Sequence, residues 1–215
     1  MVVNIRDGTS AAEAYTKIRD MIVTLRLPPG TTVKEGALQR ELGIGRTPIR
    51  EALGRLAQEG MVHIFPRRAI VVAKLGVPEV RQIFEMRLVL EAASARFAAE
   101  RVSDEELRDL RRLAAELEES RQQIDPRGFL VADQALHRRI ARDAQNTYLA
   151  ACLDHILTLN LWLWHSYFAG RGAHGTDLFS HAPIIAAIAA HDGEASAAAM
   201  REHILASKEH LLSGL

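Results

Sequence analysis

The chain has 215 residues, of which 48% are hydrophobic and 25% charged, and its formal net charge is zero. This composition is typical of a soluble globular protein with one large domain or two small ones. The single cysteine, Cys152, excludes an internal disulfide, and we expect it to be a small core residue. No apolar run is long enough for a signal peptide or a membrane span, so a cytoplasmic protein in a reducing compartment is expected.

The charge is distributed unevenly along the chain. Residues 1–75 contain 12 basic and 7 acidic residues, a net charge of +5, whereas residues 76–215 contain 15 basic and 20 acidic residues, a net charge of −5. Such an asymmetry favours two domains with different partners. We place the boundary at Gly76-Val77-Pro78, giving domains 1–75 and 76–215.

The first domain begins with three predicted helices. Apolar residues at helical spacing predict a helix over 10–25, with Ser10 as N-cap, and a short helix over 35–42 that Gly43 ends. Thr47 and Pro48 are typical of an N-cap followed by the first helical position of a third helix, which runs to about residue 59.

Two β-branched runs, 61–65 and 69–73, follow these helices and flank a basic Pro-Arg-Arg tip, which predicts a hairpin. Three helices followed by a hairpin form a winged helix-turn-helix with a two-stranded wing.

The second domain is predicted to be entirely helical. Ser103 and Glu106 have the spacing of a capping box at the start of one of its helices. The expected helices cover residues 78–100, 103–122, 126–143, 146–169, 177–191 and 194–212. We therefore expect an antiparallel all-α bundle behind the winged helix-turn-helix, and a mainly α protein.

The third helix and the wing contain the candidate DNA-binding residues. A recognition helix reads the major groove best from its N-terminal end, where arginine forms bidentate bonds with guanine. The wing tip is expected at the adjacent minor groove or its phosphates. The six candidates are Arg46, Thr47, Arg50, Arg55, Arg67 and Arg68. The alternative for each arginine alone is a solvated helix face.

A carboxylate and three imidazoles form the candidate metal site. Asp133 and His137 are four residues apart, on one face of a helix, and His181 and His203 lie on later helices. Such a set suits Zn²⁺, with Ni²⁺ or Mn²⁺ as alternatives, and leaves a position for water or a ligand oxygen. The spacing does not bring these helices together, and a lone histidine on a helix is more often a core or surface residue.

Residues 42–60 resemble the core signature of the GntR family of bacterial regulators, and the preceding Pro28-Pro29-Gly30 and the following residues 61–68 fit the same pattern. The resemblance implies that Arg46, Thr47 and Arg50 contact operator DNA. It also implies a homodimer on a palindromic operator, most relatives being repressors that an effector releases. The chain departs from the family at Gly45, where a hydroxyl residue is common, and at Ala69, where the wing usually has glycine.

The second domain resembles the FCD ligand-binding domain of the FadR branch of that family. The resemblance lies in segments 85–91, 133–137, 181–188 and 203–204 and implies that Asp133, His137, His181 and His203 bind a metal. It also implies a cavity for a small carboxylate. The candidate effector residues are Arg87, Asn160 and Trp164. Alternatively, Arg87 forms a salt bridge with Glu91 one turn further on.

The function predicted from the sequence is therefore a DNA-binding transcription regulator, by default a repressor, controlled by an organic acid at a metal site. Two alternatives stay open. One is a metal-dependent enzyme whose four ligands hold a catalytic water, although no nucleophile elbow, phosphate loop or general base accompanies them. The other is a DNA-binding protein with a purely structural metal site.

Overall fold

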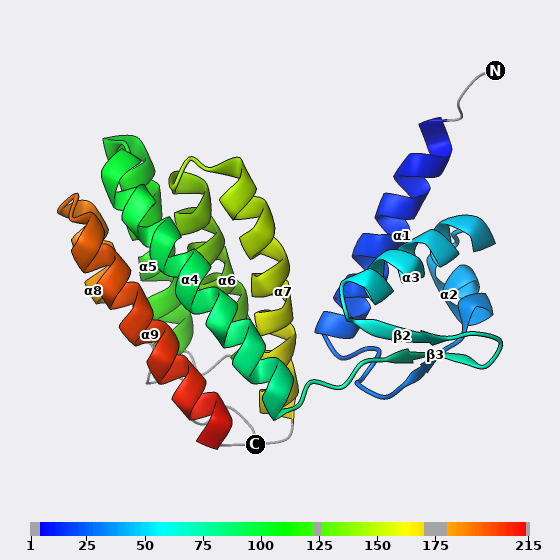
Figure 1. Cartoon of the computed structure of the whole chain (residues 1–215). Coiled ribbons are helices and arrows are strands. Elements are labelled where there is room, and N and C mark those ends of the chain that lie inside the picture. The colour runs from blue at the N-terminus through cyan, green and yellow to red at the C-terminus, as the bar shows by residue number, and fades with distance from the viewer. Residues whose placement is uncertain (1–4, 123–125, 170–179, 214–215) are drawn as a thin grey trace. The chain divides into compact units, whose positions relative to one another are not determined.

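A computed structural model describes residues 5–122, 126–169 and 180–213 of the chain. The chain divides into two compact units, Met1–Leu75 and Gly76–Leu215 (Figure 1). Among the described helices, none combines the length and the apolar character that crossing a membrane requires.

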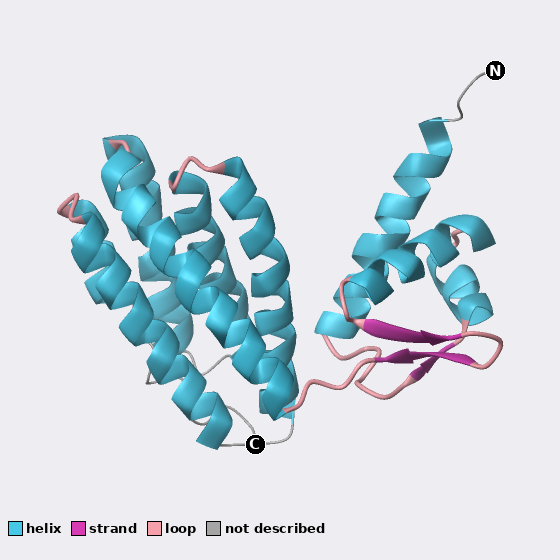
Figure 2. Cartoon of the chain, in the orientation of Figure 1, coloured by secondary structure: helices cyan, strands magenta, loops and turns pink. Residues whose placement is uncertain are grey.

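The first unit combines three helices with a small antiparallel sheet (Figure 2). Its elements are α1 (Ile5–Val23), β1 (Thr32–Val33), α2 (Glu35–Leu42), α3 (Arg46–Gln58), β2 (Val62–Phe65) and β3 (Ala69–Val72). Strand β3 is central, since it pairs with β2 from Val62↔Val72 to Phe65↔Ala69 and with β1 at Thr32↔Val71. The predicted two-stranded wing is therefore part of a three-stranded sheet. Strand β1 has only two residues, too few to show the alternation by which strands are recognised.

The core of this unit lies between α1 and α3. Ile18 and Ile22 of α1 and Ile49 and Leu56 of α3 are completely buried. Each such side chain stabilises the folded unit by about 1.5–3 kcal/mol through removal of apolar surface from water. The face of α3 that contains Ile49 and Leu56 thus anchors the helix in the core, and the opposite face is left to solvent.

Three helix boundaries of the first unit differ from the prediction. Helix α1 begins at Ile5 rather than at Ser10, and it ends at Val23 because Leu25 has a left-handed backbone, with φ of 61°. Helix α3 has Gly45 rather than Thr47 as its N-cap. Pro48 is therefore the third helical residue, where its missing N–H costs no helical hydrogen bond. Gly43 ends α2 in the left-handed conformation, as predicted.

The second unit is a helical bundle, and the mainly α fold class is confirmed. Its helices are α4 (Val77–Arg101), α5 (Asp104–Gln122), α6 (Pro126–Asp143), α7 (Thr147–Ala169), α8 (Ala182–Ala189) and α9 (Gly193–Ser213). Helix α8 is shorter than the helix predicted over 177–191, because His181 is its N-cap and Ala190 its C-cap. Residues 177–179 of that prediction lie outside the described residues.

Helix α4 organises the bundle because it packs against α6, α7, α8 and α9 (Figure 1). Its buried face contains small residues such as Ala95 and Ala99, and also two charged ones, Arg87 and Glu91. The predicted capping box is confirmed: the Ser103 N–H donates to a Glu106 carboxylate oxygen at 2.8 Å. Cys152 is exposed, so its predicted core position is wrong.

Candidate nucleic-acid interface and metal centre

Helix α3 and the wing enclose a groove of about 490 Å³ in the first unit. Arg50 enters it from α3, and Arg67 and Arg68 line it from the wing tip. Arg46 and Thr47 are exposed in the first turn of α3. The first N–H groups of a helix have no partner within it and attract anions. Five of the six predicted DNA-binding residues therefore belong to the groove or to the exposed N-terminal turn of α3.

The sixth residue, Arg55, has a different environment. Its guanidinium lies 3.6 Å from the centre of the Tyr15 ring, and its Nε donates to Glu59 at 3.0 Å. The Tyr15 hydroxyl donates to the same carboxylate at 2.8 Å. These contacts fasten α1 to α3, and the Arg55 side chain is still 57% exposed, so its predicted contact with DNA stays a proposal.

Sequence reasoning missed Glu35, the first residue of α2. Its carboxylate accepts a hydrogen bond from Arg50 Nε at 2.9 Å and lies 3.6 Å from Arg46 Nε. Exposed pairs of this kind contribute little to stability, on the order of 0–1 kcal/mol. The hydrogen bond instead orients Arg50, one of the two arginines predicted to contact bases, beside the groove.

The wing turn accommodates the departure at Ala69 without strain at that residue. Ala69 is the first residue of β3, and the left-handed position of the turn is Arg67, with φ of 59°. The turn closes through a hydrogen bond from the Arg68 N–H to the Phe65 carbonyl at 3.0 Å. A glycine at residue 69 is therefore not required by this turn.

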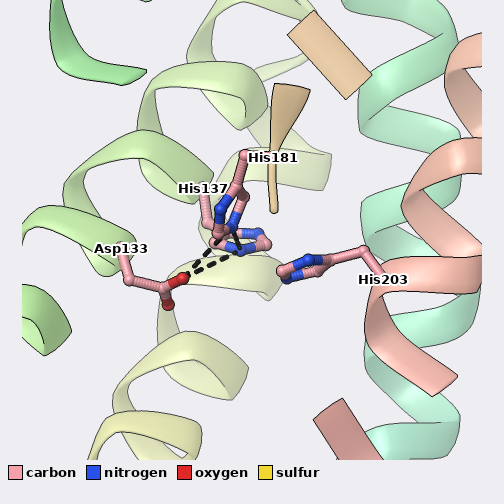
Figure 3. Close-up of side chains that lie close together, drawn as sticks. All are labelled: Asp133, His137, His181 and His203. Carbon is pink, nitrogen blue, oxygen red and sulfur yellow. Dashed lines mark hydrogen bonds and ion pairs between the residues drawn. The ribbon is translucent and has the colours of Figure 1, made fainter. Parts of the chain in front are cut away.

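In the second unit, Asp133, His137, His181 and His203 converge on one point (Figure 3). Asp133 and His137 come from adjacent turns of α6, His181 is the N-cap of α8, and His203 reaches in from α9. One ligand atom from each residue lies within 4.8 Å of all the others. The structure thus brings together four residues that the sequence places up to 70 positions apart.

The spacing of these atoms fits a divalent metal. His137 Nε2 lies 3.2 Å from His181 Nε2, and Asp133 Oδ1 lies 3.1 Å from His181 Nε2 and 3.7 Å from His137 Nε2. Ligands at the usual Zn–N distance in a tetrahedron are about 3.3–3.4 Å apart. The donor set of one carboxylate and three imidazoles suits zinc and also nickel or manganese.

The electrostatics of the site favour an anionic aspartate and a neutral His203. Burial alone would raise the pKa of Asp133, but the neighbouring His137 and His181 hold it at about 2. Burial, together with His181 and His137, lowers the pKa of His203 well below its usual value. Burial also lowers the pKa of His137, yet the Glu91 and Asp133 carboxylates raise it overall.

A second buried carboxylate, Glu91, lies behind the metal site. One of its oxygens contacts His137 Nδ1, and the other accepts a hydrogen bond from Arg87 Nε at 2.5 Å. Arg87 also donates to Asn160 Oδ1 at 3.0 Å. The alternative salt bridge with Glu91 is therefore present, and Arg87 also lines the cavity beside Asp133 and His203, so its effector-binding role stays a prediction.

The cavity at this site is small. It has a volume of about 10 Å³ and is lined by Arg87, Asp133, His203 and the aromatic residues Phe129, Trp164 and Phe168, among others. That volume holds about one water molecule and no organic acid. A groove of about 600 Å³ between α5 and α8 shares Phe129 with this cavity, and His181 also lines the groove.

Two family models match the chain. Residues 10–72 match the family described as "Bacterial regulatory proteins, gntR family", and residues 82–206 match the FCD domain. The second match alone covers more than half of the chain.

Relatives and solved structures agree with these matches. An HTH-type transcriptional regulator from Agrobacterium vitis is 35% identical over 43% of this chain and 54% of its own length. Another from Streptomyces ambofaciens is 32% identical over 69% of this chain and 64% of its own. The structure titled "E. coli McbR/YncC" superposes with a TM-score of 0.83 over 99% of both chains at 20% identity, which indicates a shared fold.

Proposed function

Because the chain belongs to the GntR family of bacterial regulatory proteins and contains an FCD domain, we propose that it is a transcription regulator whose DNA binding responds to a metal-bound small acid. Its relatives are transcriptional regulators rather than enzymes, so the enzyme alternative is set aside. The observation that carries the proposal is the convergence of four ligand atoms within 4.8 Å in the second unit. A sensor requires such a site apart from the DNA-binding surface.

The proposed DNA interface consists of the groove between α3 and the wing and the first turn of α3. Arg46 and Arg50 would contact guanine edges in the major groove, and Thr47 a phosphate. Arg67 and Arg68 would contact the minor groove or its phosphates. Two copies related by two-fold symmetry would bind the two halves of a palindromic operator, and binding would block transcription by default.

The proposed metal site consists of Asp133, His137, His181 and His203. A divalent metal held there would supply a Lewis-acid position for one oxygen of a carboxylate. Arg87, which lines the same cavity, would pair with that carboxylate. Asn160 touches Arg87 and would act through it, whereas Trp164 lines the cavity directly. Since the cavity holds about one water, an organic acid requires the lining aromatic side chains to move.

The test measures metal binding and operator binding on the same protein. Zinc content after dialysis should be one equivalent in the wild type and lost in the double variant with His181→Ala and His203→Ala. Replacing His155 of α7 with alanine is the matched control and should leave the metal in place. Full zinc occupancy in the double variant would refute the site.

DNA binding is tested with operator fragments recovered by selection from random sequence. Arg50→Ala should weaken binding and relax sequence preference by about 1–3 kcal/mol, and Arg67→Ala should mainly reduce the dependence of affinity on salt. Arg55→Ala, which would remove a phosphate contact rather than a base contact, should leave the sequence preference unchanged. Unchanged binding in the Arg50 and Arg67 variants would refute the interface.

The small cavity specifically favours a second candidate function, in which the metal only stabilises the fold. The two functions differ in their response to acids. In a sensor, binding of a small carboxylate to the zinc-loaded protein changes the affinity for operator DNA. Operator DNA then changes the affinity for the carboxylate by the same factor, because coupling between two binding sites is reciprocal. A structural site would give metal-dependent melting and an operator affinity that no carboxylate changes.

A further inference from the structure

Glu91 lies between the proposed metal ligand His137 and Arg87, the residue proposed to bind the acid. Its side chain is 1% exposed, and its two oxygens have different partners: one meets Arg87 and the other His137. Arg87 is itself fixed by Asn160 of α7. A continuous chain of buried polar contacts therefore runs from α7 through α4 to the metal-site face of α6.

We propose that Glu91 is a positioning residue of the metal centre, which acts through His137. This inference rests on the metal site proposed above. The imidazole of His137 has two nitrogens, and only Nε2 faces the cluster, 3.2 Å from His181 Nε2. When Glu91 accepts a hydrogen bond from the Nδ1–H of His137, the lone pair of Nε2 points toward the metal position. Carboxylates that orient metal-binding histidines in this way strengthen metal affinity.

The contact with Arg87 gives Glu91 its fixed orientation. A carboxylate buried to this degree needs a positive partner, and Arg87 supplies it from one turn earlier on the same helix at 2.5 Å. The bond from Arg87 to Asn160 in turn restrains the guanidinium. The geometry of His137 therefore depends on groups that do not touch the metal position, and one of them is the residue proposed to bind the acid.

The decisive measurement is the zinc affinity of the metal-loaded, full-length protein in competition with a chromophoric chelator. Glu91→Gln should bind Zn²⁺ about 10–100-fold more weakly than the wild type. Glu85→Gln removes a carboxylate from the exposed face of the same helix and is the matched control, with unchanged affinity. Equal affinities for wild type and Glu91→Gln would overturn the proposal.

A double-variant cycle separates positioning from a general effect of charge. In the His137→Ala background, Glu91→Gln should cause no further loss of zinc affinity, because its target is gone. A loss of the same size in both backgrounds would overturn the proposal. A positioning role also predicts that the His137 Nδ1–H proton resonance of the zinc-loaded protein moves upfield in Glu91→Gln, since an amide is a weaker acceptor than a carboxylate.

Folding is checked by tryptophan fluorescence, because a neutral residue at 91 leaves Arg87 buried without its partner. If Glu91→Gln does not fold, Glu91→Asp is compared with Glu85→Asp, since the shorter carboxylate keeps the charge but withdraws from His137. Weaker zinc binding in Glu91→Asp alone supports the proposal, and equal binding refutes it. Absence of zinc binding in the wild type would instead refute the proposed metal site.

Discussion

Replacement of Arg87 with methionine removes the positive partner of a buried carboxylate while leaving a flexible side chain to fill the space. Both Arg87 and Glu91 are 1% exposed, and their atoms approach to 2.5 Å. Solvent therefore does not screen the carboxylate that the substitution leaves behind. The loss of stability in the variant therefore measures how much the buried Arg87–Glu91 pair stabilises the fold.

The expected loss follows from the two contacts that disappear. Removing one member of a buried ion pair costs about 3–5 kcal/mol, because the other member stays buried without it. Here the Glu91 carboxylate keeps its contact with His137. The loss of the 3.0 Å bond to Asn160 adds about 1 kcal/mol for an amide oxygen left without its donor. We expect Arg87→Met to reduce the free energy of unfolding of the second unit by about 4–6 kcal/mol.

Urea denaturation followed by tryptophan fluorescence measures this loss on the metal-free protein. The chain has two tryptophans, Trp162 and Trp164, and both lie on α7, so the signal reports the second unit. The double variant with Arg87→Met and Glu91→Gln removes both charges. Its loss should be smaller than the sum of the single losses by about 3 kcal/mol.

A loss below about 1 kcal/mol in Arg87→Met would refute the reasoning, because an exposed pair contributes no more than that. Additive losses in the double variant would also refute it, because two groups in direct contact must interact. Either result would mean that water reaches this site or that another positive group stabilises the Glu91 carboxylate.

Three further predictions concern Glu35, Glu91 and Phe129. Glu35→Gln should reduce the preference for operator over random DNA, measured by fluorescence anisotropy, because Arg50 loses its 2.9 Å partner; an unchanged ratio would refute that role. Burial alone would raise the pKa of Glu91, but Arg87 and His137 lower it to about 2. The ionised Glu91 therefore stabilises the folded state above its ordinary pKa of 4.5, and this stabilisation is lost as the pH falls toward 2. The free energy of unfolding should therefore fall more between pH 5 and pH 3 in the wild type than in Glu91→Gln, and equal falls would contradict this. Phe129→Ala should speed removal of zinc by a chelator, since this side chain borders both the small cavity and the 600 Å³ groove; unchanged rates would exclude it as the barrier.

Local patterns were sufficient to predict most of the helices. The end of α2 at Gly43 and the capping box at Ser103 depend on residues within one or two turns, and both are confirmed. The start of α3 was predicted wrongly because Thr47-Pro48 has the composition of a cap, whereas the backbone of Gly45 takes that position. Strand β1 was missed because its pairing with β3 joins segments about 40 residues apart.

The candidate metal site could be predicted only in part from spacing. Asp133 and His137 share a helix face through their separation of four residues, but His181 and His203 were candidates by residue type alone, since spacing does not bring their helices to α6. Glu91 was considered only as a partner for Arg87. Its contact with His137 spans 46 residues and exists because α4 packs against α6, which no local pattern encodes.

The tight closure of the metal-site cavity has a consequence for sensitivity. If an acid binds only to a minor population with the aromatic lining displaced, its apparent dissociation constant is the intrinsic one divided by the fraction of molecules in that open state. A tenfold change in that fraction is then a tenfold change in the concentration that triggers the response. Substitutions at Phe129 or Trp164 would retune the regulator to a different range of acid concentrations without altering any group that recognises the acid's carboxylate.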